Sequence, residues 1–406
     1  MQATVADGLP AFLASLEDMC NIDCGSYTPA GVNQIGDLVA AELASLGASV
    51  ERRPDSKDRY GDTVIGTFSG AAGGPRVLLI GHMDTVFSEG TVAKRPFRID
   101  DGIARGAGVS DMKAGLLAGL RALAALRELG RSAGGGAGLP FERLTFVANP
   151  DEEIGSPSST PHIREIAATA DACFVLECAR ENGDFVSARK GIADIRLTIN
   201  GRAAHAGVEP EKGRSAIVAG AALVREINEL NGRWPQVTTN VGVFKAGTRP
   251  NIVCDQAELQ VDVRAMAAGN LSAAILAIEA LAAAPAVPDV TIDVETMAGW
   301  APMEKLERSG RLADHVIALA RRLGFETKDV STGGASDANT TSGMGVPTLD
   351  GLGPIGGNDH SPAEYLDVDS IVPRTALLAG LLLAIARDPE VLGWRADDPR
   401  FVTTPA

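Results

Sequence analysis

The chain has 406 residues, of which 45% are hydrophobic and 22% charged, an ordinary globular composition with enough length for two or three domains. Its formal net charge of -15 at pH 7 would repel a nucleic-acid backbone and an anionic membrane surface, so neither is expected as a partner. No continuous apolar stretch reaches the roughly 18 residues that a transmembrane helix requires, which predicts a soluble protein.

The first 190 residues alternate helical and apolar strand-like segments. Residues 9–47 predict two helices, the second ended by Gly47 in the position of a C-cap. A Leu- and Ala-rich helical stretch at 112–130 lies between the first two of three apolar runs that predict strands: Arg76–Val86, Glu142–Glu153 and Ala170–Cys178. This order is typical of a largely parallel sheet covered by helices, which binds ligands at the carboxyl ends of its strands. The Gly-rich stretch Arg131–Pro140 has no helix behind it and predicts a surface loop.

From about residue 191 the pattern changes to that of an antiparallel sheet. Apolar Ile195, Leu197 and Ile199 alternate with polar residues, as in a strand with one wet face. The segments that follow complete the order β-α-β-β-α-β, the ferredoxin-like arrangement, by residue 299. We therefore expect a mixed α/β catalytic domain formed by residues 1–190 and 300–406, interrupted by an inserted α+β domain at 191–299, with a closing helix at 369–387.

Polar residues gather where the predicted strands end. They are His82 and Asp84, Asp111, the run Asp151–Glu153, Glu177 and His360. Taken alone, each has an ordinary explanation, such as a structural histidine or an acid that caps a helix. Taken together, two histidines and several carboxylates at one edge of one sheet form a mixed nitrogen and oxygen ligand set suited to zinc or a similar divalent metal.

The number of candidate ligands indicates two metal ions. A single catalytic zinc takes three protein ligands, whereas this chain offers enough for a pair if one carboxylate bridges. Adjacent residues of an extended segment point to opposite sides, so one of Glu152 and Glu153 can bind metal while the other acts as a base, with Asp151 as a turn residue. Asp84 can reach the second ring nitrogen of His82 and fix its tautomer, or it can simply cap a turn.

Seven short motifs occur along the chain in this order: GHMDTV, AKRPFRI, DMKAG, NPDEEIGS, INGRAAHAG, STGGASDAN and HSPAEY. In sequence and order they resemble the M20 family of metallopeptidases, and within it the glutamate carboxypeptidase type, over about residues 10–387. The resemblance implies a zinc-exopeptidase-like fold whose inserted domain serves as lid and dimerisation domain. It therefore also implies a homodimer.

The resemblance further implies a co-catalytic pair of Zn²⁺ ions in each subunit, for which Co²⁺ or Mn²⁺ could substitute. Carried over by motif, five residues would be the ligands: His82 and Glu177 for one ion, Glu153 and His360 for the other, and Asp111 bridging both. Glu152 would be the general base that deprotonates the bridging water and later protonates the leaving amine, with Asp84 orienting His82.

Substrate-binding residues follow from the same resemblance. His205 would reach across the dimer to stabilise the tetrahedral oxyanion, assisted by Asn251. Arg264 would bind the substrate carboxylate, a task for which a bidentate guanidinium is suited, although a solvent-facing strand residue is an equal interpretation of its position. The segment Ser331–Asp337, with Gly333 and Gly334, could offer backbone N–H groups to the same carboxylate.

Three departures from the family pattern concern the substrate side. The stretch Glu295–Glu304 has no basic residue, a lysine expected after Glu177 has no clear counterpart, and Cys254 stands where the family usually has proline. The preference for a C-terminal glutamate therefore stays open. Six basic residues could select an anionic side chain or form ordinary surface ion pairs: Arg180, Arg189, Lys190, Lys212, Arg214 and Arg249.

The leading hypothesis is a zinc exopeptidase that removes a C-terminal acidic amino acid from a small peptide or N-acyl conjugate. The alternatives are an N-acyl amino-acid deacylase or dipeptidase with the same site, a catalytically silent peptide-binding protein, and a two-metal phosphoesterase. Five sparse cysteines indicate reduced thiols, with Cys20 and Cys24 the one candidate pair. The N-terminus lacks the basic region of a secretory signal, which favours the cytoplasm; a periplasmic or secreted location would require a removed leader.

Overall fold

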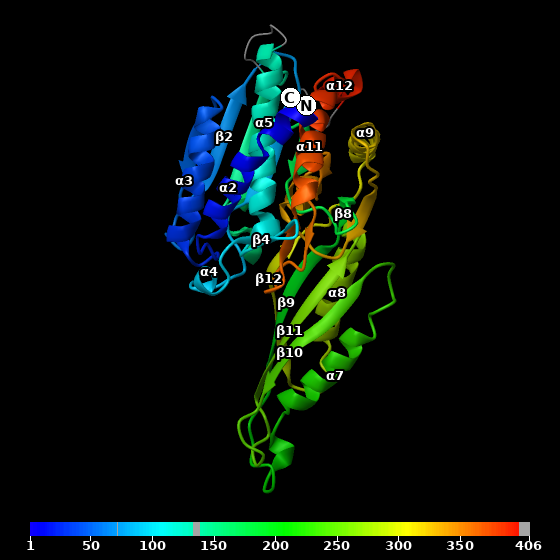
Figure 1. The fold of residues 1–406 in the computed structure, drawn as a ribbon. Helices are drawn as coiled ribbons and strands as arrows, with labels where there is room; N and C mark the ends of the chain where they lie inside the picture. The colour runs from blue at the N-terminus through cyan, green and yellow to red at the C-terminus, as the bar shows by residue number, and fades with distance from the viewer. Residues whose placement is uncertain (71, 133–138, 398–406) are drawn as a thin grey trace. The chain divides into compact units, whose positions relative to one another are not determined.

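The computed structural model describes residues 1–70, 72–132 and 139–397, so most of the predicted Gly-rich loop Arg131–Pro140 lies outside the described residues (Figure 1). The chain divides into two compact units. Unit 1 consists of Met1–Ser187, Lys305–Ser331 and Ser336–Ala406, and unit 2 of Ala188–Glu304 and Thr332–Ala335. These limits lie close to the predicted inserted segment 191–299, whose independence as a folding domain stays a prediction.

The main sheet of unit 1 is mixed and largely parallel, as predicted. Its six strands lie in the order β1 (Ser49–Arg53), β2 (Thr63–Ser69), β6 (Arg143–Asn149), β3 (Arg76–His82), β7 (Ala172–Val175) and β14 (Thr348–Leu349). Strands β6, β3, β7 and β14 run parallel, whereas β1 and β2 are antiparallel to their neighbours. Every residue of β3 after Arg76 is buried, because helices cover both faces of the sheet.

The helices of unit 1 supply this cover, with α3 packed on β2, α5 on β3 and α10 on β7. They are α1 (Gln2–Asp7), α2 (Leu9–Cys20), α3 (Pro29–Ser45), α4 (Thr91–Lys94), α5 (Ala114–Ser132), α6 (Thr160–Ala167), α9 (Glu307–Leu323), α10 (Asp337–Gly343), α11 (Ile371–Ile385) and α12 (Pro389–Asp397). Gly47 follows the end of α3 with a φ of 84°, the left-handed conformation that the predicted helix stop requires. Helices α1 and α12 were not predicted from the sequence.

Short strands complete unit 1. β4 (Arg98–Asp100), β5 (Ile103–Arg105), β15 (Gly356–Gly357) and β16 (Tyr365–Asp367) form a small antiparallel sheet, and β8 (Phe185–Arg189) pairs with β13 (Asp329–Thr332). The four-stranded sheet matters for function because β15 and β16 flank the loop that carries His360.

One helical stretch, Val368–Ile385, is long and apolar enough to cross a membrane, with a mean hydropathy of 1.7 over 18 residues. The expectation of no such stretch was therefore wrong by length, because a short turn (Val368–Ser370) extends α11. In the structure 67% of this window is buried, and α11 packs against α5 and α9 as a core helix. The five cysteines are free and buried, so Cys20 and Cys24 form no disulfide. The cellular compartment stays a prediction.

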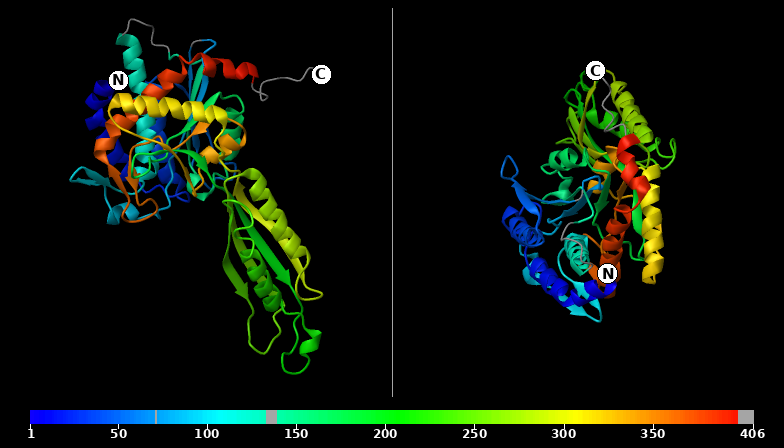
Figure 2. Two further views of the ribbon diagram at one scale, coloured as in Figure 1. Left: turned by 90° about the vertical axis from the view of Figure 1, so that its right-hand side faces the viewer. Right: turned by 90° about the horizontal axis from the view of Figure 1, so that it is seen from above.

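Unit 2 has the predicted β-α-β-β-α-β order. Its elements are β9 (Gly191–Asn200), α7 (Ala216–Asn228), β10 (Thr238–Ala246), β11 (Gln256–Ala265), α8 (Ala268–Ala283) and β12 (Thr291–Trp300). The strands form an antiparallel sheet in the order β10-β11-β9-β12, and both helices pack on the same face (Figure 2). Ile195, Leu197 and Ile199 point into this core and are completely buried, which confirms the alternation seen in the sequence.

Candidate active site

Three parallel strands bring most of the predicted ligands to one edge of the main sheet. His82 is the last residue of β3, Glu153 lies in a 3₁₀ turn (Glu152–Ile154) that follows β6, and Glu177 comes directly after β7. Because β6, β3 and β7 are neighbours and run parallel, their carboxyl ends meet. Asp111 joins them from the turn Val109–Lys113 before α5, and His360 from the loop between β15 and β16.

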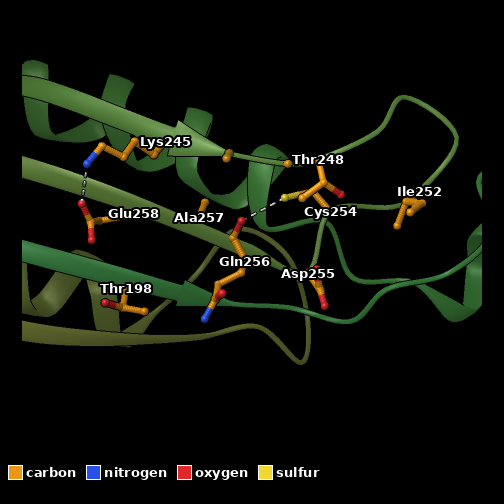
Figure 3. A pocket seen from close by; sticks show the side chains of 11 residues that line it. Thr198, Lys245, Thr248, Ile252, Cys254, Asp255, Gln256, Ala257 and Glu258 are labelled. Atoms are coloured by element: carbon orange, nitrogen blue, oxygen red, sulfur yellow. Dashed lines mark hydrogen bonds and ion pairs between the residues drawn. The ribbon is translucent and has the colours of Figure 1, made fainter.

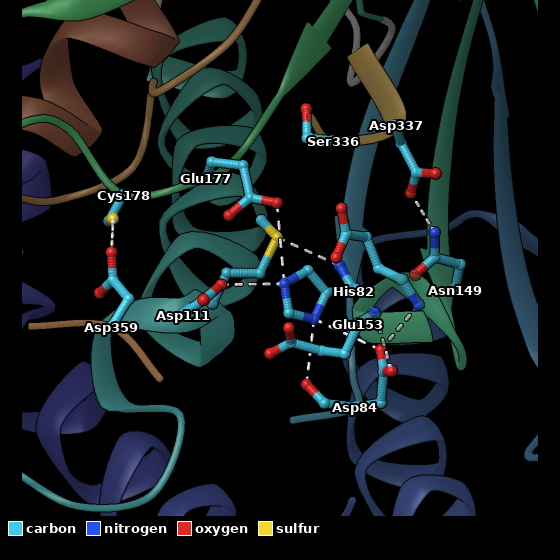
Figure 4. A network of polar contacts seen from close by, with 12 residues as sticks. His82, Asp84, Asp111, Asn149, Glu153, Glu177, Cys178, Ser336, Asp337 and Asp359 are labelled. Atoms are coloured by element: carbon cyan, nitrogen blue, oxygen red, sulfur yellow. Dashed lines mark hydrogen bonds and ion pairs between the residues drawn. The ribbon is translucent and has the colours of Figure 1, made fainter. Parts of the chain in front are cut away.

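The five side chains form two triplets that share one carboxylate. His82 Nε2 lies 3.0 Å from Asp111 Oδ1 and 3.7 Å from Glu177 Oε1, and Figure 4 shows both acids facing this imidazole. His360 Nε2 lies 3.1 Å from Asp111 Oδ2 and 3.1 Å from Glu153 Oε2. Each triplet offers ligand atoms that all lie within 4.8 Å of one another. The two oxygens of Asp111 therefore face different histidines, as a bridging ligand requires.

The donor set fits divalent metal ions. Each triplet consists of one imidazole and two carboxylates, counting Asp111 in both, and such a set suits zinc while leaving a coordination position for water or substrate. Acidic groups at this density would repel one another, so a cation held among them would relieve the repulsion. The residues present therefore fit the pair of metal ions that the sequence predicts.

Hydrogen bonds inside the cluster shift its pKa values in opposite directions. The pKa of Asp111 would be raised by burial, but bonds to His360 and His82 bring it well below its usual range. The pKa of His360 is raised to about 10, chiefly by its bonds to Asp111 and Glu153. Burial opposes the charged form of His82, yet Asp111 and Asp84 raise its pKa well above the usual range. The carboxylates thus favour positive charge at both histidine positions.

The side chains of Glu152 and Glu153 have different surroundings, as predicted, although not for the predicted reason. They lie on the 3₁₀ turn and not on an extended segment, and successive side chains of such a turn still point in directions about 120° apart. Glu153 belongs to a triplet, whereas Glu152 belongs to neither among the described residues. Glu152 is 8% exposed, and burial raises the pKa of its carboxyl well above the usual range. A buried carboxylate of this kind is suited to accept a proton.

Asp84 holds the turn that carries these two acids. Its carboxylate accepts the backbone N–H of Glu152 at 3.1 Å and of Glu153 at 3.2 Å, as well as the Ser26 hydroxyl at 2.6 Å. Toward His82, the nearest atom to Nδ1 is the Asp84 carbonyl oxygen at 3.0 Å, with Oδ1 at 3.4 Å. Asp84 therefore contacts the second ring nitrogen of His82, but mainly through its backbone.

Asp151 is a turn residue. Its buried carboxylate accepts the Ser158 N–H at 2.5 Å and the Ser159 hydroxyl at 2.6 Å, and its carbonyl oxygen accepts the Ser156 N–H. These bonds close the loop between the 3₁₀ turn and α6, so the first acid of the run supports the other two.

The predicted carboxylate-binding residues of unit 2 lie together. Arg264 donates to the Gly333 carbonyl oxygen at 3.0 Å, and Arg189 donates to that of Gly334 at 3.0 Å. Lys190 bonds through its backbone to Thr332 on the same segment. The Arg264 guanidinium also pairs with the Asp262 carboxylate at 3.0 Å, which orients it along the strand. Two guanidinium groups thus contact the Gly-rich segment 332–335.

His205 and Asn251 lie at the other end of unit 2. His205 is exposed and forms an isolated β-bridge with Ile252, and the Asn251 carbonyl oxygen accepts the Ala206 N–H at 3.1 Å. Strand β11 begins just after this loop and ends beside Arg264, so about 27 Å of extended chain separates the two groups. One copy of unit 2 therefore cannot present both groups to the same small substrate.

Residues 78–384 match the model of Peptidase family M20/M25/M40. The chain belongs to this family. It is 32% identical over 383 residues to Carboxypeptidase G2 of Pseudomonas sp. (strain RS-16), covering 93% of this chain and 90% of that protein. Acetylornithine deacetylase of Edwardsiella ictaluri (strain 93-146) is 27% identical over 394 residues, covering 92% and 97%. Aminopeptidase PepT from Bacillus cereus ATCC 10987 shares the fold, with a TM-score of 0.75, 23% identity and coverage of 92% and 98%.

Membership of the M20 family confirms the resemblance seen in the motifs and makes the protein a metallopeptidase-type hydrolase. The family is generally metal-dependent and acts on peptides or N-acyl amino acids, in line with the two triplets. This membership favours a hydrolase over the two alternatives of a catalytically silent binding protein and a phosphoesterase.

Two buried acids of this M20 chain that lie close to predicted site residues, Glu364 and Asp337, were not predicted. Glu364 accepts three backbone N–H groups beside the shared ligand: Gly108 at 2.9 Å, Ser110 at 2.9 Å and Asp111 at 3.1 Å. Burial raises the pKa of Glu364 to about 7 despite these bonds. Asp337 accepts the Ser156 hydroxyl at 2.6 Å and an Asn149 amide N–H, as Figure 4 shows for Asn149. The motifs HSPAEY and STGGASDAN contain both acids, but nothing in the pattern distinguishes them from surface residues.

Unit 2 of the M20 chain also contains a cavity of about 410 Å³ at the start of β11 (Figure 3). Its lining includes Lys245, whose ammonium lies 3.7 Å from Glu258, and Cys254, which donates to the Gln256 carbonyl oxygen at 3.0 Å. None of the predicted site residues lines it. The cavity therefore takes no part in the chemistry assigned to the two triplets.

Proposed function

We propose that this protein is a zinc-dependent carboxypeptidase that hydrolyses the amide bond to a C-terminal acidic amino acid. The observation that carries the proposal is the position of Asp111, whose two oxygens contact His82 and His360 at 3.0 and 3.1 Å within two triplets of ligand type. The similarity to Carboxypeptidase G2 over 93% of the chain supports this activity over others in the family.

Two Zn²⁺ ions fit the ligand set: His82 and Glu177 would hold one, Glu153 and His360 would hold the other, and Asp111 would offer an oxygen to each. When bound, such a pair polarises the scissile carbonyl group and lowers the pKa of an attacking water. Asp84 holds the Glu152–Glu153 turn in register with His82, so that the ligand Glu153 and its neighbour keep their separate positions.

Glu152 acts as the general base. Its carboxylate takes a proton from the water that attacks the carbonyl carbon and gives a proton to the nitrogen of the leaving amino acid, so that the C–N bond breaks with a neutral amine as product. A pKa raised by burial suits both steps, because the carboxyl group must hold the proton for part of the cycle.

The substrate carboxylate binds at unit 2. Arg264 supplies a guanidinium that can form paired hydrogen bonds with a carboxylate, and the segment Gly333–Gly334 beside it has no side chains to block approach. Arg189 adds a second guanidinium at the same segment. This charge favours an acidic amino acid over a neutral one.

A homodimer formed through unit 2 completes the site. Seven large apolar side chains of unit 2 are exposed. Leu276 at 63% lies on α8 and Met297 at 39% on β12, and the other five are Val208 at 73%, Val218 at 57%, Phe244 at 42%, Ile217 at 41% and Ile252 at 39%. These five lie on or near α7 and β10. β10 is an edge strand of the described sheet, so a strand of a second copy can pair with it and extend the sheet. Because His205 and Arg264 lie at opposite ends of β11, His205 serves the site of the partner subunit.

Amino-acid release from a panel of C-terminally varied peptides and N-acyl amino acids tests the proposal, with metal-free protein assayed before and after addition of Zn²⁺. We expect zinc-dependent release of glutamate or aspartate from peptides. Release only from N-acyl amino acids or dipeptides would favour a deacylase or dipeptidase with the same metal site. No release from any member would overturn the proposal.

A further inference from the structure

A cavity of about 360 Å³ lies in unit 1 next to the two triplets. Three segments line it: residues 25–28, residues 85–89, and Glu153 with Ile154. Glu153 belongs both to this cavity and to the triplet of Asp111 and His360. A group bound in the cavity would therefore lie next to the bond that is cleaved.

The walls of the cavity are joined by bonds within the protein. The Thr85 N–H donates to the Cys24 carbonyl oxygen at 3.0 Å, which pairs the two loops. A Cβ atom at Gly25 would lie 2.4 Å from the Phe87 carbonyl oxygen, so only glycine permits this approach. Ser26 donates to Asp84 at 2.6 Å, and Asp84 also holds the N–H of Glu153. The cavity is thus preformed and tied to the catalytic turn.

Apolar side chains are exposed on the cavity. Tyr27, at 74%, is the most exposed large hydrophobic side chain in the described part of the chain, and Val86 is 42% exposed. The Tyr27 ring lies 6.0 Å from that of Tyr60, which extends the aromatic surface beyond the cavity. Apolar side chains exposed to water beside a reaction centre are unfavourable, and a bound apolar ligand group would bury them.

The charge of the cavity disfavours acidic ligands. No lysine or arginine is among its lining residues, and Glu89 is its one charged lining residue that is not a predicted metal ligand. This is the opposite of the basic surroundings of the segment 332–335 in unit 2, where Arg264 and Arg189 gather. Each surface is therefore suited to a ligand group of a different charge.

We propose that this cavity binds the acyl side of the substrate, that it selects an uncharged apolar acyl group through Tyr27 and Val86, and that Glu89 rejects acidic acyl groups. The assignment rests on the proposed function, because it places the C-terminal amino acid at unit 2. It names specificity-determining residues in unit 1 for the same reaction.

The test compares N-acetyl, N-benzoyl and N-succinyl derivatives of the amino acid that the zinc-loaded protein releases fastest. We expect kcat/KM to be about tenfold higher for benzoyl than for acetyl, from burial of one ring, and lowest for succinyl. Tyr27→Ala should remove most of the benzoyl advantage and leave acetyl hydrolysis within about twofold. Ile99→Ala, at an apolar residue of unit 1 that is 41% exposed and lies outside the cavity, should change neither.

Charge reversal gives the second arm. Glu89→Lys should raise kcat/KM for the succinyl substrate about threefold or more at low salt, without changing acetyl hydrolysis. Glu326→Lys, at an acid whose side chain is 77% exposed and outside the cavity, makes the same change in net charge and should have no such effect. Equal hydrolysis of all three substrates, or equal losses for acetyl and benzoyl in Tyr27→Ala, would overturn the cavity assignment and leave the carboxypeptidase proposal standing.

If none of the three substrates is hydrolysed, binding decides the cavity assignment, whereas release of amino acids from peptides still decides the proposed function. Calorimetry with zinc-loaded Glu152→Ala protein should then show the benzoyl derivative binding about tenfold more tightly than the acetyl derivative, with the difference lost in Glu152→Ala/Tyr27→Ala. Equal affinities would overturn the assignment.

Discussion

The carboxylate of Glu364 accepts the backbone N–H of Asp111 at 3.1 Å, across 253 positions of the chain. Two further N–H groups of the same loop, from Gly108 and Ser110, end on this carboxylate. Glu364 itself belongs to the loop that carries His360. One buried side chain therefore ties the backbone of the shared ligand to the loop of a second ligand.

Replacing this carboxylate should weaken metal binding. In Glu364→Gln the amide keeps one acceptor oxygen but turns an N–H₂ group toward backbone N–H donors, which should displace Asp111. We expect the affinity for Zn²⁺ to fall by about 10- to 100-fold, measured by competition with a chromophoric chelator. Glu326→Gln, at a side chain that is 77% exposed, is the control. Unchanged affinity in Glu364→Gln would mean that the loop holds Asp111 without help.

Neighbouring acids should respond differently to the same change. Glu152→Ala should retain two metal ions per subunit and lose about 10³-fold or more in kcat, because only the base is removed. Glu153→Ala should lose metal from its triplet, since it removes a ligand. Metal content measured after gel filtration, together with kcat, distinguishes the two. Substantial turnover in Glu152→Ala would overturn its assignment as the base.

The edge of the sheet that holds the cluster could be predicted because His82, Glu153 and Glu177 each follow an apolar run, and parallel strands end together. The spacing of the residues could not predict that Asp111 contacts both histidines. That expectation came from the family resemblance. Glu364 could not be found in either way, because its partners are backbone N–H groups, which leave no mark on the residue pattern.

Other features needed three-dimensional structure for different physical reasons. Asp84, which follows β3, accepts the backbone N–H groups of the 3₁₀ turn that carries Glu152 and Glu153. This contact joins distant parts of the chain, so local propensity could not predict the turn. The separation of His205 from Arg264 depends on the length of β11 and on which loops meet at its ends. The sequence shows Tyr27 only as a residue between two helices, and only the structure shows that it is exposed in the same cavity as Glu153.

If His205 serves the partner subunit, mixed dimers should recover activity. His205→Ala and Glu152→Ala should each be nearly inactive alone. In a refolded equimolar mixture, a heterodimer has one site with an intact Glu152 and a partner's intact histidine, so about a quarter of wild-type activity should return for a symmetric dimer. No recovery, with heterodimers demonstrated by differential tagging, would place His205 in the site of its own subunit.

Arg264 should act on substrate binding. Arg264→Ala should raise KM for acidic substrates and lower kcat/KM by about 10- to 100-fold, with Arg264→Lys recovering only part because it cannot form paired bonds. Arg196→Ala, at another arginine of the same sheet that pairs with Glu295 at 3.0 Å, is the matched control. Equal losses for acidic and neutral C-terminal residues would mean that Arg264 does not contribute to side-chain selection.

The last prediction concerns acid stability, through an ion pair far from the metal ligands in sequence. Asp388 Oδ2 lies 2.9 Å from Arg311 Nε and 2.6 Å from His315 Nε2, which ties the segment before α12 to α9. Burial alone would raise the pKa of Asp388, but these bonds outweigh burial and lower the pKa from an ordinary 3.8 to about 2. The pKa of Asp388 is therefore lower in the folded state than in the unfolded state. At a pH above the unfolded-state pKa, the ionised carboxylate stabilises the fold, and this stability is lost as the pH falls toward the folded-state pKa.

Asp388→Asn removes that contribution at every pH. Urea unfolding of metal-free protein should therefore show a midpoint lower than wild type at about pH 5, with the difference shrinking between about pH 4 and 2 as the wild-type carboxylate becomes protonated. Asp314→Asn, an exposed acid on the same helix α9, should change the midpoint little across this range. A difference between wild type and Asp388→Asn that stays constant down to about pH 2 would show that ionisation of Asp388 does not stabilise the fold, because such a constant loss reflects packing and not charge.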